Sequence, residues 1–360
     1  MKKVLLGTSA IALAGAFATS ANSAEWNVKV GGYHNQMVAF GTTDIQGSTA
    51  DFDGIDVKQN AEIFFLPSIT LDNGLKFGAN VQLESAGATG TADTIDESYM
   101  FVRGSFGEIN LGSENSAGYK MHYAAPNVAI ISLNSPSTTQ YIAWGGQATG
   151  IFRGTIGGTY LENNRNNDAD RITYYTPRFA GFQVGASYAR DASQDSNAQA
   201  DINAFGTTHD IFDLGANYVN DFGGVNLALS ARWGIATIEP AAANQAGQDP
   251  TVLGFGANVG FGGFTIGGSW AEQNDAGQLD GTAYDIGAKY STGPWSFSLT
   301  YFHGENTQGE QDTFGAGINY QLAKGVRLNG FGAYVDYQAE PGTTSDADGF
   351  VIGTGIGLSF

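Results

Sequence analysis

Residues 225–233 read Val-Asn-Leu-Ala-Leu-Ser-Ala-Arg-Trp, and apolar and polar side chains alternate through this stretch. The apolar set runs from Val225 through Leu229 to Trp233, and the other set carries Ser230 and Arg232. Successive side chains of a β-strand point to opposite faces, so a period of two predicts a strand with one apolar and one polar face. Leu229 and Ser230 are therefore expected on opposite sides of a sheet.

The same alternation recurs along the chain in stretches of about ten residues. Further copies lie at 182–189, 253–261, 264–270, 284–290, 295–301, 314–322 and 352–360. Aromatic residues stand at the ends of these apolar faces, as they do in the interfacial girdles of membrane barrels. A soluble sandwich also alternates, so the period of two by itself leaves that class open. The strand expected at 326–337 changes its apolar face midway, which either a bulge or a subunit contact would explain.

Short and long connections alternate between the expected strands. The short ones have turn residues and lie at 72–74, 105–107, 179–181, 222–224, 262–263, 292–294 and 323–325. The long ones are polar and acidic and lie at about 41–55, 85–95, 113–169, 191–209, 238–249, 272–281, 304–311 and 338–348. Fifteen connections imply sixteen strands, and tight turns at one end with long loops at the other are typical of outer-membrane barrels. Because lipid leaves no backbone group unpaired, we expect an all-β, closed, sixteen-stranded antiparallel transmembrane barrel with a water-filled lumen.

The N-terminus has the pattern of a secretory signal peptide rather than of a strand. Lys2 and Lys3 precede an apolar run that is too short to span a membrane, and small residues follow as far as Ala24. We predict a signal peptide at 1–24 and a barrel at 25–360, with cleavage after Ala21 or an uncleaved anchor as alternatives. Without the two lysines, 14 basic and 35 acidic residues leave the mature chain a formal charge of −21.

Composition and motif spacing exclude several functional classes. The excess of acidic residues argues against a nucleic-acid partner, because phosphate binding needs cations. The chain has no Cys, so disulfides and thiol chemistry are absent. The four histidines are His34, His122, His209 and His303, with neither metalloprotease nor nucleophile-elbow spacing around them. We therefore expect no catalytic residues and no enzyme activity.

Four segments together resemble the Gram-negative general diffusion porins, most closely the alphaproteobacterial type. They are 71–77 (LDNGLKF), 103–116 (RGSFGEINLGSENS), 171–182 (RITYYTPRFAGF) and the C-terminal GLSF at 357–360. The resemblance implies a homotrimer in the outer membrane of a Gram-negative bacterium, in contact with membrane lipid and lipopolysaccharide. It also implies insertion by the barrel-assembly machinery, with Ile356, Leu358 and Phe360 as the assembly signal.

In such porins the third loop folds into the lumen and narrows it, and residues 113–169 are the corresponding connection here. A loop of this length needs a role in a compact domain, and its apolar stretches at 123–133 and 141–144 would suit packing on the inner wall. A loop lying over the barrel mouth or against a neighbouring subunit is the alternative.

The resemblance implies passive diffusion of ions and small hydrophilic solutes. The formal charge of −21, together with Glu62 and Asp96, predicts a preference for cations. Alternation places Asp96, Ser98 and Met100 on the inner face, and motif alignment puts Glu62 and Asp96 where the family has wall arginines. The pore-lining candidates are Lys58, Glu62, Glu84, Asp96, Glu114, Lys120, Arg153 and Arg171. A substrate-specific channel, for instance for sugars, is the alternative function.

No cofactor is expected, with one open alternative. Asp51 and Asp53 belong to an acidic connection whose carboxylates suit Ca²⁺, although the spacing is not that of an EF-hand. The other interpretation is that these groups are simply solvated.

Overall fold

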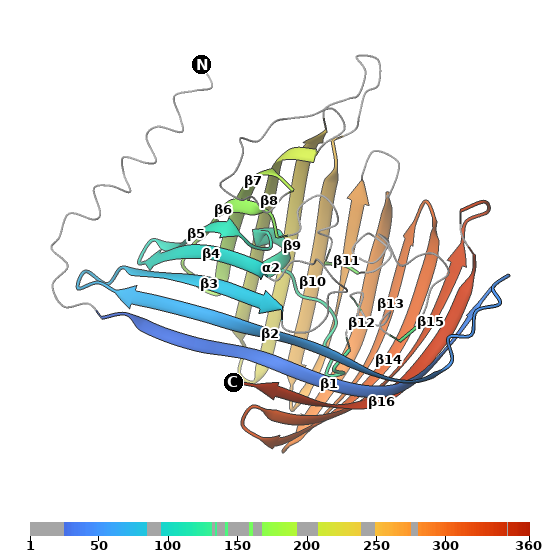
Figure 1. Ribbon diagram of the computed structural model, residues 1–360. Helices are drawn as coiled ribbons and strands as arrows, with labels where there is room; N and C mark the ends of the chain where they lie inside the picture. Colours follow the sequence, from blue (N-terminus) through green and yellow to red (C-terminus); the bar gives the residue numbers. More distant parts are fainter. Residues whose placement is uncertain are drawn as a thin grey trace, which may run out of the picture.

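The computed structural model describes residues 25–84, 95–131, 134, 141–142, 158–160, 168–192, 208–238, 249–274, 280–343 and 345–360. In these residues sixteen antiparallel strands form a closed barrel in which each strand pairs with its sequence neighbours and β16 returns to β1 (Figure 1). The fold predicted from the sequence is confirmed. The signal peptide expected at 1–24 lies outside the described residues and stays a prediction.

All strands except β5 and β6, which have 7 and 6 residues, are long enough to cross a bilayer when tilted. Their bounds are β1 (Asn27–Ile45), β2 (Gly54–Thr70), β3 (Lys76–Glu84), β4 (Ile95–Gly104), β5 (Gly107–Ser113), β6 (Asp170–Tyr175), β7 (Phe182–Asp191), β8 (Thr208–Asp221), β9 (Val225–Ile238), β10 (Thr251–Phe261), β11 (Phe264–Asn274), β12 (Gly281–Thr292), β13 (Trp295–Asn306), β14 (Gly309–Ala323), β15 (Val326–Ala339) and β16 (Ala347–Ser359). One short helix, α2 (Ala117–Lys120), is also described. Among the described residues, no helix has the length and apolar character to cross a membrane.

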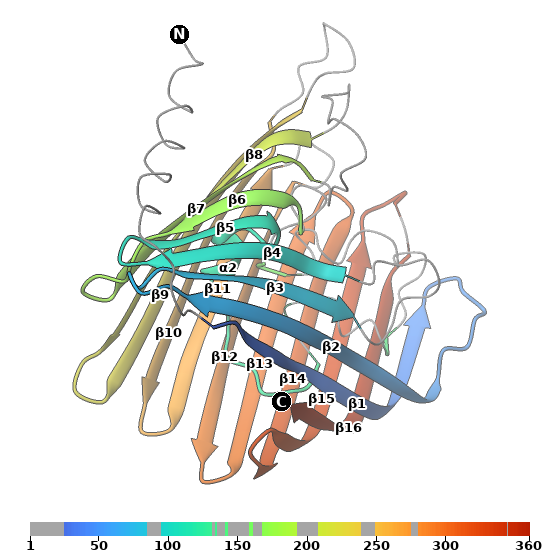
Figure 2. The ribbon, with the colours of Figure 1, turned by 60° about the vertical axis from the view of Figure 1, so that its left-hand side comes forward.

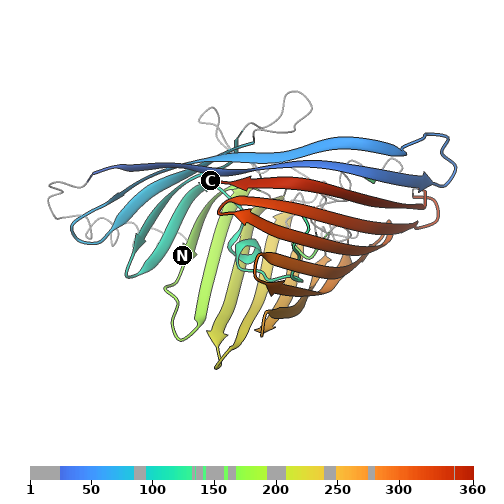
Figure 3. The same ribbon diagram turned by 90° about the horizontal axis from the view of Figure 1, so that it is seen from below.

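The barrel closes where the first and last strands meet (Figure 3). The amide of Gly32 donates to the carbonyl of Phe360, and the amide of Phe360 donates to the carbonyl of Gly32, both at 3.1 Å. Gly32 has φ +146°, and a Cβ there would lie 2.3 Å from the carbonyl oxygen of Glu62. Glycine therefore allows β1 to approach β2 closely at the point where the barrel is sealed.

The connections confirm the predicted alternation at the turn end of the barrel and correct it at one place. Tight turns join β2 to β3, β4 to β5, β6 to β7, β8 to β9, β10 to β11, β12 to β13 and β14 to β15, and several show as hairpins at one end in Figure 2. The prediction of a long loop at 304–311 was wrong. Residues 303–306 of β13 pair with 309–312 of β14, which leaves only Thr307 and Gln308 as the turn. Polar residues had suggested a loop, but their backbones complete the sheet ladder.

The inner and outer faces differ as the alternation predicts on most strands. Leu229 is 39% exposed on the outer face of β9, whereas Ser230 on the inner face is 7% exposed. Strand β15 is different because its inner face is apolar: Phe331 and Tyr337 are buried and belong to one cluster with Ile131 and Tyr141. The change of apolar face at 326–337 thus reflects packing of the segment after β5 against the inner wall, rather than a bulge within β15 or a subunit contact.

The predicted faces of β4 were wrong. Met100 is 60% exposed on the outer face, whereas Tyr99 faces inward, where its hydroxyl accepts a hydrogen bond from Asn80 Nδ2 at 3.2 Å. A register shift between Val81 and Leu83 changes the pairing of β3 with β4. Phe101, also inward, covers Gly78, so large side chains occupy the face that alternation had assigned to small polar ones. A shift of one residue moves every side chain of a strand to the opposite face. Residues 99–102 (Tyr-Met-Phe-Val) do not differ enough in polarity for the sequence to indicate which of them face inward.

Candidate pore constriction

Two carboxylates face each other on the inner surface of β2 and β3. Glu62 and Glu84 are direct cross-strand partners, and Tyr33 of β1 donates its hydroxyl proton to Glu62 Oε1 at 2.6 Å. Within the described residues, no lysine or arginine lies at ion-pair distance from either carboxylate. Lys58, the base predicted on this wall, instead pairs with Asp56 at 2.5 Å. This part of the lumen is therefore acidic.

A second group of charged side chains lies where the chain continues from β5 into α2. Ser116 caps α2 by accepting from the amide of Tyr119 at 3.2 Å, and Lys120 stands in the last turn. The Lys120 ammonium lies 2.6 Å from Glu114 Oε2, 3.7 Å from Glu97 Oε2 and 4.6 Å from the centre of the Tyr99 ring. We call Glu97, Tyr99, Glu114 and Lys120 the loop clamp.

Lys120 is neutralised within the loop clamp and is a poor site for solute anions. Burial lowers the pKa of the Lys120 ammonium, but the carboxylates of Glu114 and Glu97 more than offset that effect, and the pKa lies above its ordinary value. Glu114 is fully buried and also accepts from Asn110 Nδ2 at 3.0 Å. Two carboxylates beside one ammonium leave the clamp with an excess of negative charge.

The segment after α2 runs along the inner wall and is held there by short polar side chains of the strands. Four of its backbone amides donate to inward-facing oxygens. The pairs are Tyr123 N to Ser230 Oγ (2.9 Å), Ala125 N to Asp285 Oδ1 (3.0 Å), Val128 N to Ser298 Oγ (3.0 Å) and Ile130 N to Asn329 Oδ1 (2.8 Å). An irregular chain inside a barrel must satisfy its amides somewhere, and these acceptors do so. The described part of the third connection therefore occupies the lumen beside β9 to β15.

Histidine 122 contributes to this attachment rather than to proton chemistry. Its Nε2 lies 3.2 Å from Thr159 Oγ1, and its ring meets Tyr160 edge-on at 4.9 Å. Burial, with a smaller effect from the charge of Arg232, lowers the pKa of His122 to about 3. The imidazole is therefore neutral at physiological pH.

The predicted pore-lining residues do not form one continuous ladder. Glu62 and Glu84 lie together, Glu114 and Lys120 lie in the loop clamp, and Arg171 on β6 is buried and donates from Nε to the carbonyl of Ala169 at 3.1 Å. Asp96 is half-buried beside the β3–β4 irregularity. Arg153 lies outside the described residues. Their functional roles stay predictions.

Sequence reasoning missed two inward-facing groups. Glu97 was hidden by the reversed faces of β4; it accepts from Gln82 Nε2 at 2.7 Å and from the amide of Asn115 at 3.1 Å. Arg232 lies on the polar face of β9, but no motif in the sequence distinguished it from the other polar residues of that face. It forms a fully buried ion pair with Asp213 at 3.6 Å, so both charges are removed from the open lumen.

The remaining predicted sites lie away from the lumen. Ile356, Leu358 and Phe360 are 50%, 41% and 67% exposed and share the outer face of the closing strand, and their assembly role stays a prediction. Asp51 and Asp53 are exposed. Asp51 Oδ1 accepts from the amide of Asp53 at 2.9 Å, and Asp53 Oδ1 accepts from the amide of Thr43 at 3.3 Å. The calcium site also stays a prediction.

Comparison with known proteins gives a consistent result. Residues 8–340 match the family model described as Gram-negative porin. The outer membrane porin protein 32 of Delftia acidovorans is 25% identical over 297 residues, which are 79% of this chain and 76% of that protein. An anion-selective porin from Comamonas acidovorans has a TM-score of 0.62 at 18% identity, covering 93% of this chain and 100% of that one. The trimer form of the Vibrio cholerae outer membrane protein OmpT has a TM-score of 0.57 at 14% identity, covering 94% and 100%.

Proposed function

Because the chain belongs to the Gram-negative porin family and is an outer-membrane channel protein, we propose that it passes small hydrophilic solutes and ions passively, with a preference for cations. The proposal rests on one observation above all: Glu62 of β2 and Glu84 of β3 lie side by side on the inner surface without a basic partner among the described residues. Unpaired carboxylates in a narrow aqueous passage attract cations and repel anions.

Three basic residues of the described lumen are held by carboxylates. Lys120 is bound by Glu114, Arg232 is bound by Asp213, and Lys58 is bound by Asp56. Arg171 is 5% exposed. The Comamonas neighbour is described as anion-selective, but at 18% identity the likeness shows the fold alone. Selectivity in this chain is a property of its own side chains.

We further propose that the barrel assembles as a homotrimer in contact with outer-membrane lipid and lipopolysaccharide, inserted by the barrel-assembly machinery. One structural neighbour is a trimer. The outer face of β1 near the closure carries Trp26, Val28 and Val30, exposed at 64%, 56% and 62%. Apolar surface of this size needs lipid or a neighbouring subunit to cover it.

A channel specific for sugars is the second candidate function, and one observation favours it. Tyr119 and Tyr160 have ring centres 5.1 Å apart beside His122, close to the loop clamp that contains Tyr99. Aromatic rings in a lumen offer flat apolar surfaces for sugar rings. Such a channel would show saturable conductance block by a sugar, whereas a general pore would not.

Reversal potentials in a KCl gradient across planar bilayers test the cation preference. We expect the wild type to favour K⁺ and the double variant Glu62→Gln with Glu84→Gln to lose most of this preference. The effect should be strong at 0.1 M salt, where the Debye length is about 10 Å, and weak at 1 M, where it is about 3 Å.

A matched control removes the same charge elsewhere. Asp72→Asn with Glu340→Gln changes two exposed carboxylates outside the strands and should leave the preference nearly intact. A wild-type pore that favours Cl⁻, or a Glu62/Glu84 double variant that behaves as wild type at 0.1 M salt, would refute the proposal.

A further inference from the structure

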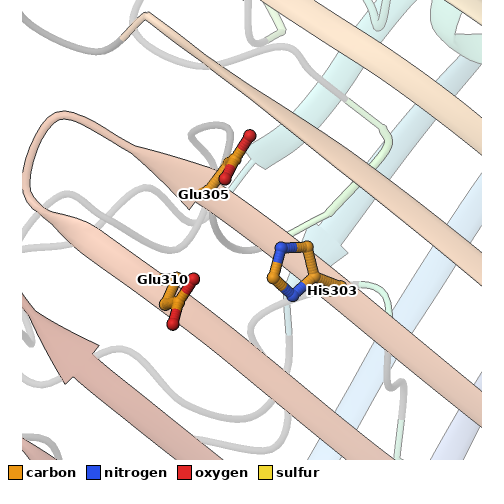
Figure 4. A group of neighbouring side chains, drawn as sticks. All are labelled: His303, Glu305 and Glu310. Carbon is orange, nitrogen blue, oxygen red and sulfur yellow. The ribbon is translucent and has the colours of Figure 1, made fainter.

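The β13–β14 hairpin carries a compact group of ionisable side chains at its loop end. His303 and Glu305 lie on β13 and Glu310 lies on β14, and Figure 4 shows the three side chains on neighbouring strands. Each offers one ligand atom, and these atoms all lie within 4.8 Å of one another. They share the outer face with Tyr284 and Tyr301, so the group stands at the end of an aromatic band, away from the lumen.

The charges of this group are unbalanced. Glu305 and Glu310 are direct cross-strand partners, and Asp312 adds a third carboxylate opposite His303. Like charges in directly opposed positions destabilise a sheet. Among the described residues, the basic side chain that pairs with these carboxylates is His303, whose imidazole faces Asp312. A bound divalent cation would offset this repulsion.

His303 is held in the orientation that a metal ligand requires. Its Nδ1 lies 2.9 Å from Asp312 Oδ1, which also accepts the hydroxyl proton of Tyr301 at 2.5 Å. The ring lies against Tyr284 with centres 5.1 Å apart. When Nδ1 donates to a carboxylate, the imidazole keeps its lone pair on Nε2, and this carboxylate–histidine arrangement accompanies most metal-bound histidines.

Glu305 is positioned as well. Thr282 of β12 donates from its hydroxyl to Glu305 Oε1 at 3.0 Å, which leaves Oε2 available. Glu305 and Glu310 are exposed, so their carboxylates can rotate the short distance that separates 4.8 Å from the spacing of ligands around one ion. Zinc binds nitrogen and carboxylate oxygen at about 2.0–2.2 Å, and adjacent ligands on one ion then lie roughly 3–3.5 Å apart.

We propose that His303 Nε2 and the carboxylates of Glu305 and Glu310 bind a divalent transition-metal ion of the zinc type, with Asp312 as the positioning residue. One imidazole with two carboxylates suits Zn²⁺, whereas Ca²⁺ and Mg²⁺ prefer sites made of oxygen alone. The site lies on the outer surface near the loop end of the barrel. It is independent of the charges that line the pore.

Titration of the untagged, refolded barrel tests the site. We expect Zn²⁺ to bind with a stoichiometry of one per chain by calorimetry, and Co²⁺ at the same site to give visible absorption bands typical of nitrogen and carboxylate ligation. His303→Ala, Glu305→Gln and Glu310→Gln should each weaken binding at least tenfold. Asp312→Asn should weaken it by about 10- to 100-fold, because an outer partner of a metal-bound histidine contributes that much.

Controls separate this site from general attraction of cations to an acidic protein. Glu340→Gln removes an exposed carboxylate elsewhere and should bind Zn²⁺ as the wild type does. A large excess of Ca²⁺ should not displace the metal. The four site variants change side chains near the loop end of one hairpin, and heat-modifiable migration in gels verifies that each barrel, including the Glu340→Gln control, has folded. Absence of saturable Zn²⁺ binding, wild-type binding by folded His303→Ala, or displacement by equimolar Ca²⁺ would each overturn the proposal.

Discussion

The two sides of the lumen obey the same alternation and yet differ in what they contact. The open wall is formed by the inner faces of β2 and β3 around Glu62 and Glu84, of which Glu84 is exposed and Glu62 is half-buried. On the covered wall, formed by the inner faces of β9, β12, β13 and β15, Ser230 and Asn329 are 7% and 2% exposed because the segment after α2 lies over them. Polarity toward the lumen therefore does not imply contact with water.

The kind of polar side chain separates the two walls. The covered wall presents short acceptors (Ser, Asp and Asn) at positions where a backbone amide can reach them. The open wall presents longer charged groups such as Lys58 and Glu62. A backbone with unpaired amides gains more from fixed, short acceptors than from mobile side chains that lose entropy when they are ordered. The segment after α2 consequently follows the covered wall, and Tyr141 and Ile142 also reach β1, where Met37 and Ala39 are buried against them.

An arginine placed on each surface should give the largest contrast. Leu229→Arg puts a charge on the lipid face and should lower the free energy of unfolding by about 2–4 kcal/mol if the site is near mid-membrane. Asn60→Arg adds the same charge to the inner face of the open wall, where it is solvated, and should change stability little. Refolding titrations in lipid vesicles measure both.

The reverse order of these two effects would show that the inner and outer faces have been exchanged. Ser230→Arg is a third variant for the same comparison, on the covered wall. Alternation alone predicts tolerance at an inner position, but the covered wall has no space for the larger side chain. Intermediate destabilisation is expected there.

Removal of one loop anchor should give the next largest effect. Asp285→Ala deletes the acceptor for the amide of Ala125 and for Asn134 Nδ2. A buried donor left unpaired costs about 1–3 kcal/mol, and release of the segment should raise the single-channel conductance. Asp285→Asn retains an oxygen acceptor, so its stability and conductance should be closer to those of the wild type.

Glu62→Ala removes a hydrogen bond on the open wall, and it should lower the free energy of unfolding less than Asp285→Ala does. Equal losses of stability would contradict the distinction between the two walls.

The pH dependence of the loop clamp should give the smallest effect. The pKa of Lys120 is raised in the folded protein, so its stabilising contribution is fully present below the ordinary lysine value of about 10.4 and is lost as pH rises through the higher folded value. Open-channel noise should therefore stay constant from pH 7 to 10 and increase only above that range. Lys120→Gln should show the increased noise at every pH. Increased noise of the wild type at pH 8–9, or a quiet Lys120→Gln pore, would contradict the role assigned to the clamp.

The two faces of a strand were predicted correctly where the side chains alternate with a period of two and differ clearly in polarity. The alternation from Val225 to Trp233 identified both faces of β9, and turn residues such as 222–224 fixed the ends of the strands. The assignment of faces failed at Tyr99 and Met100, because the side chains on both faces of β4 are large and weakly polar there. The prediction of a loop failed at 304–311, where polar residues belong to a paired hairpin.

The candidate site was less accessible to sequence reasoning than the fold. Alternation on β2 and β3 put Glu62 and Glu84 on one face, and the structure pairs them directly, while their pore-lining role stays a prediction. That they lack basic partners among the described residues could not be foreseen, since it depends on Lys120 being held by Glu114 and on Lys58 being held by Asp56. The choice of ion-pair partner leaves no periodic signal in the sequence, even between residues that are close in the chain.

The sequence by itself determined the closed sixteen-stranded barrel, because lipid requires every backbone group to be paired and imposes alternation on every strand. It also determined the acidic character of the protein. The tertiary structure alone decided which wall the third connection covers, which charges neutralise one another, and that His303 of β13 meets Glu310 of β14. The physical reason is that backbone pairing is a local and repetitive demand, whereas charge compensation depends on which side chains the closed barrel brings together.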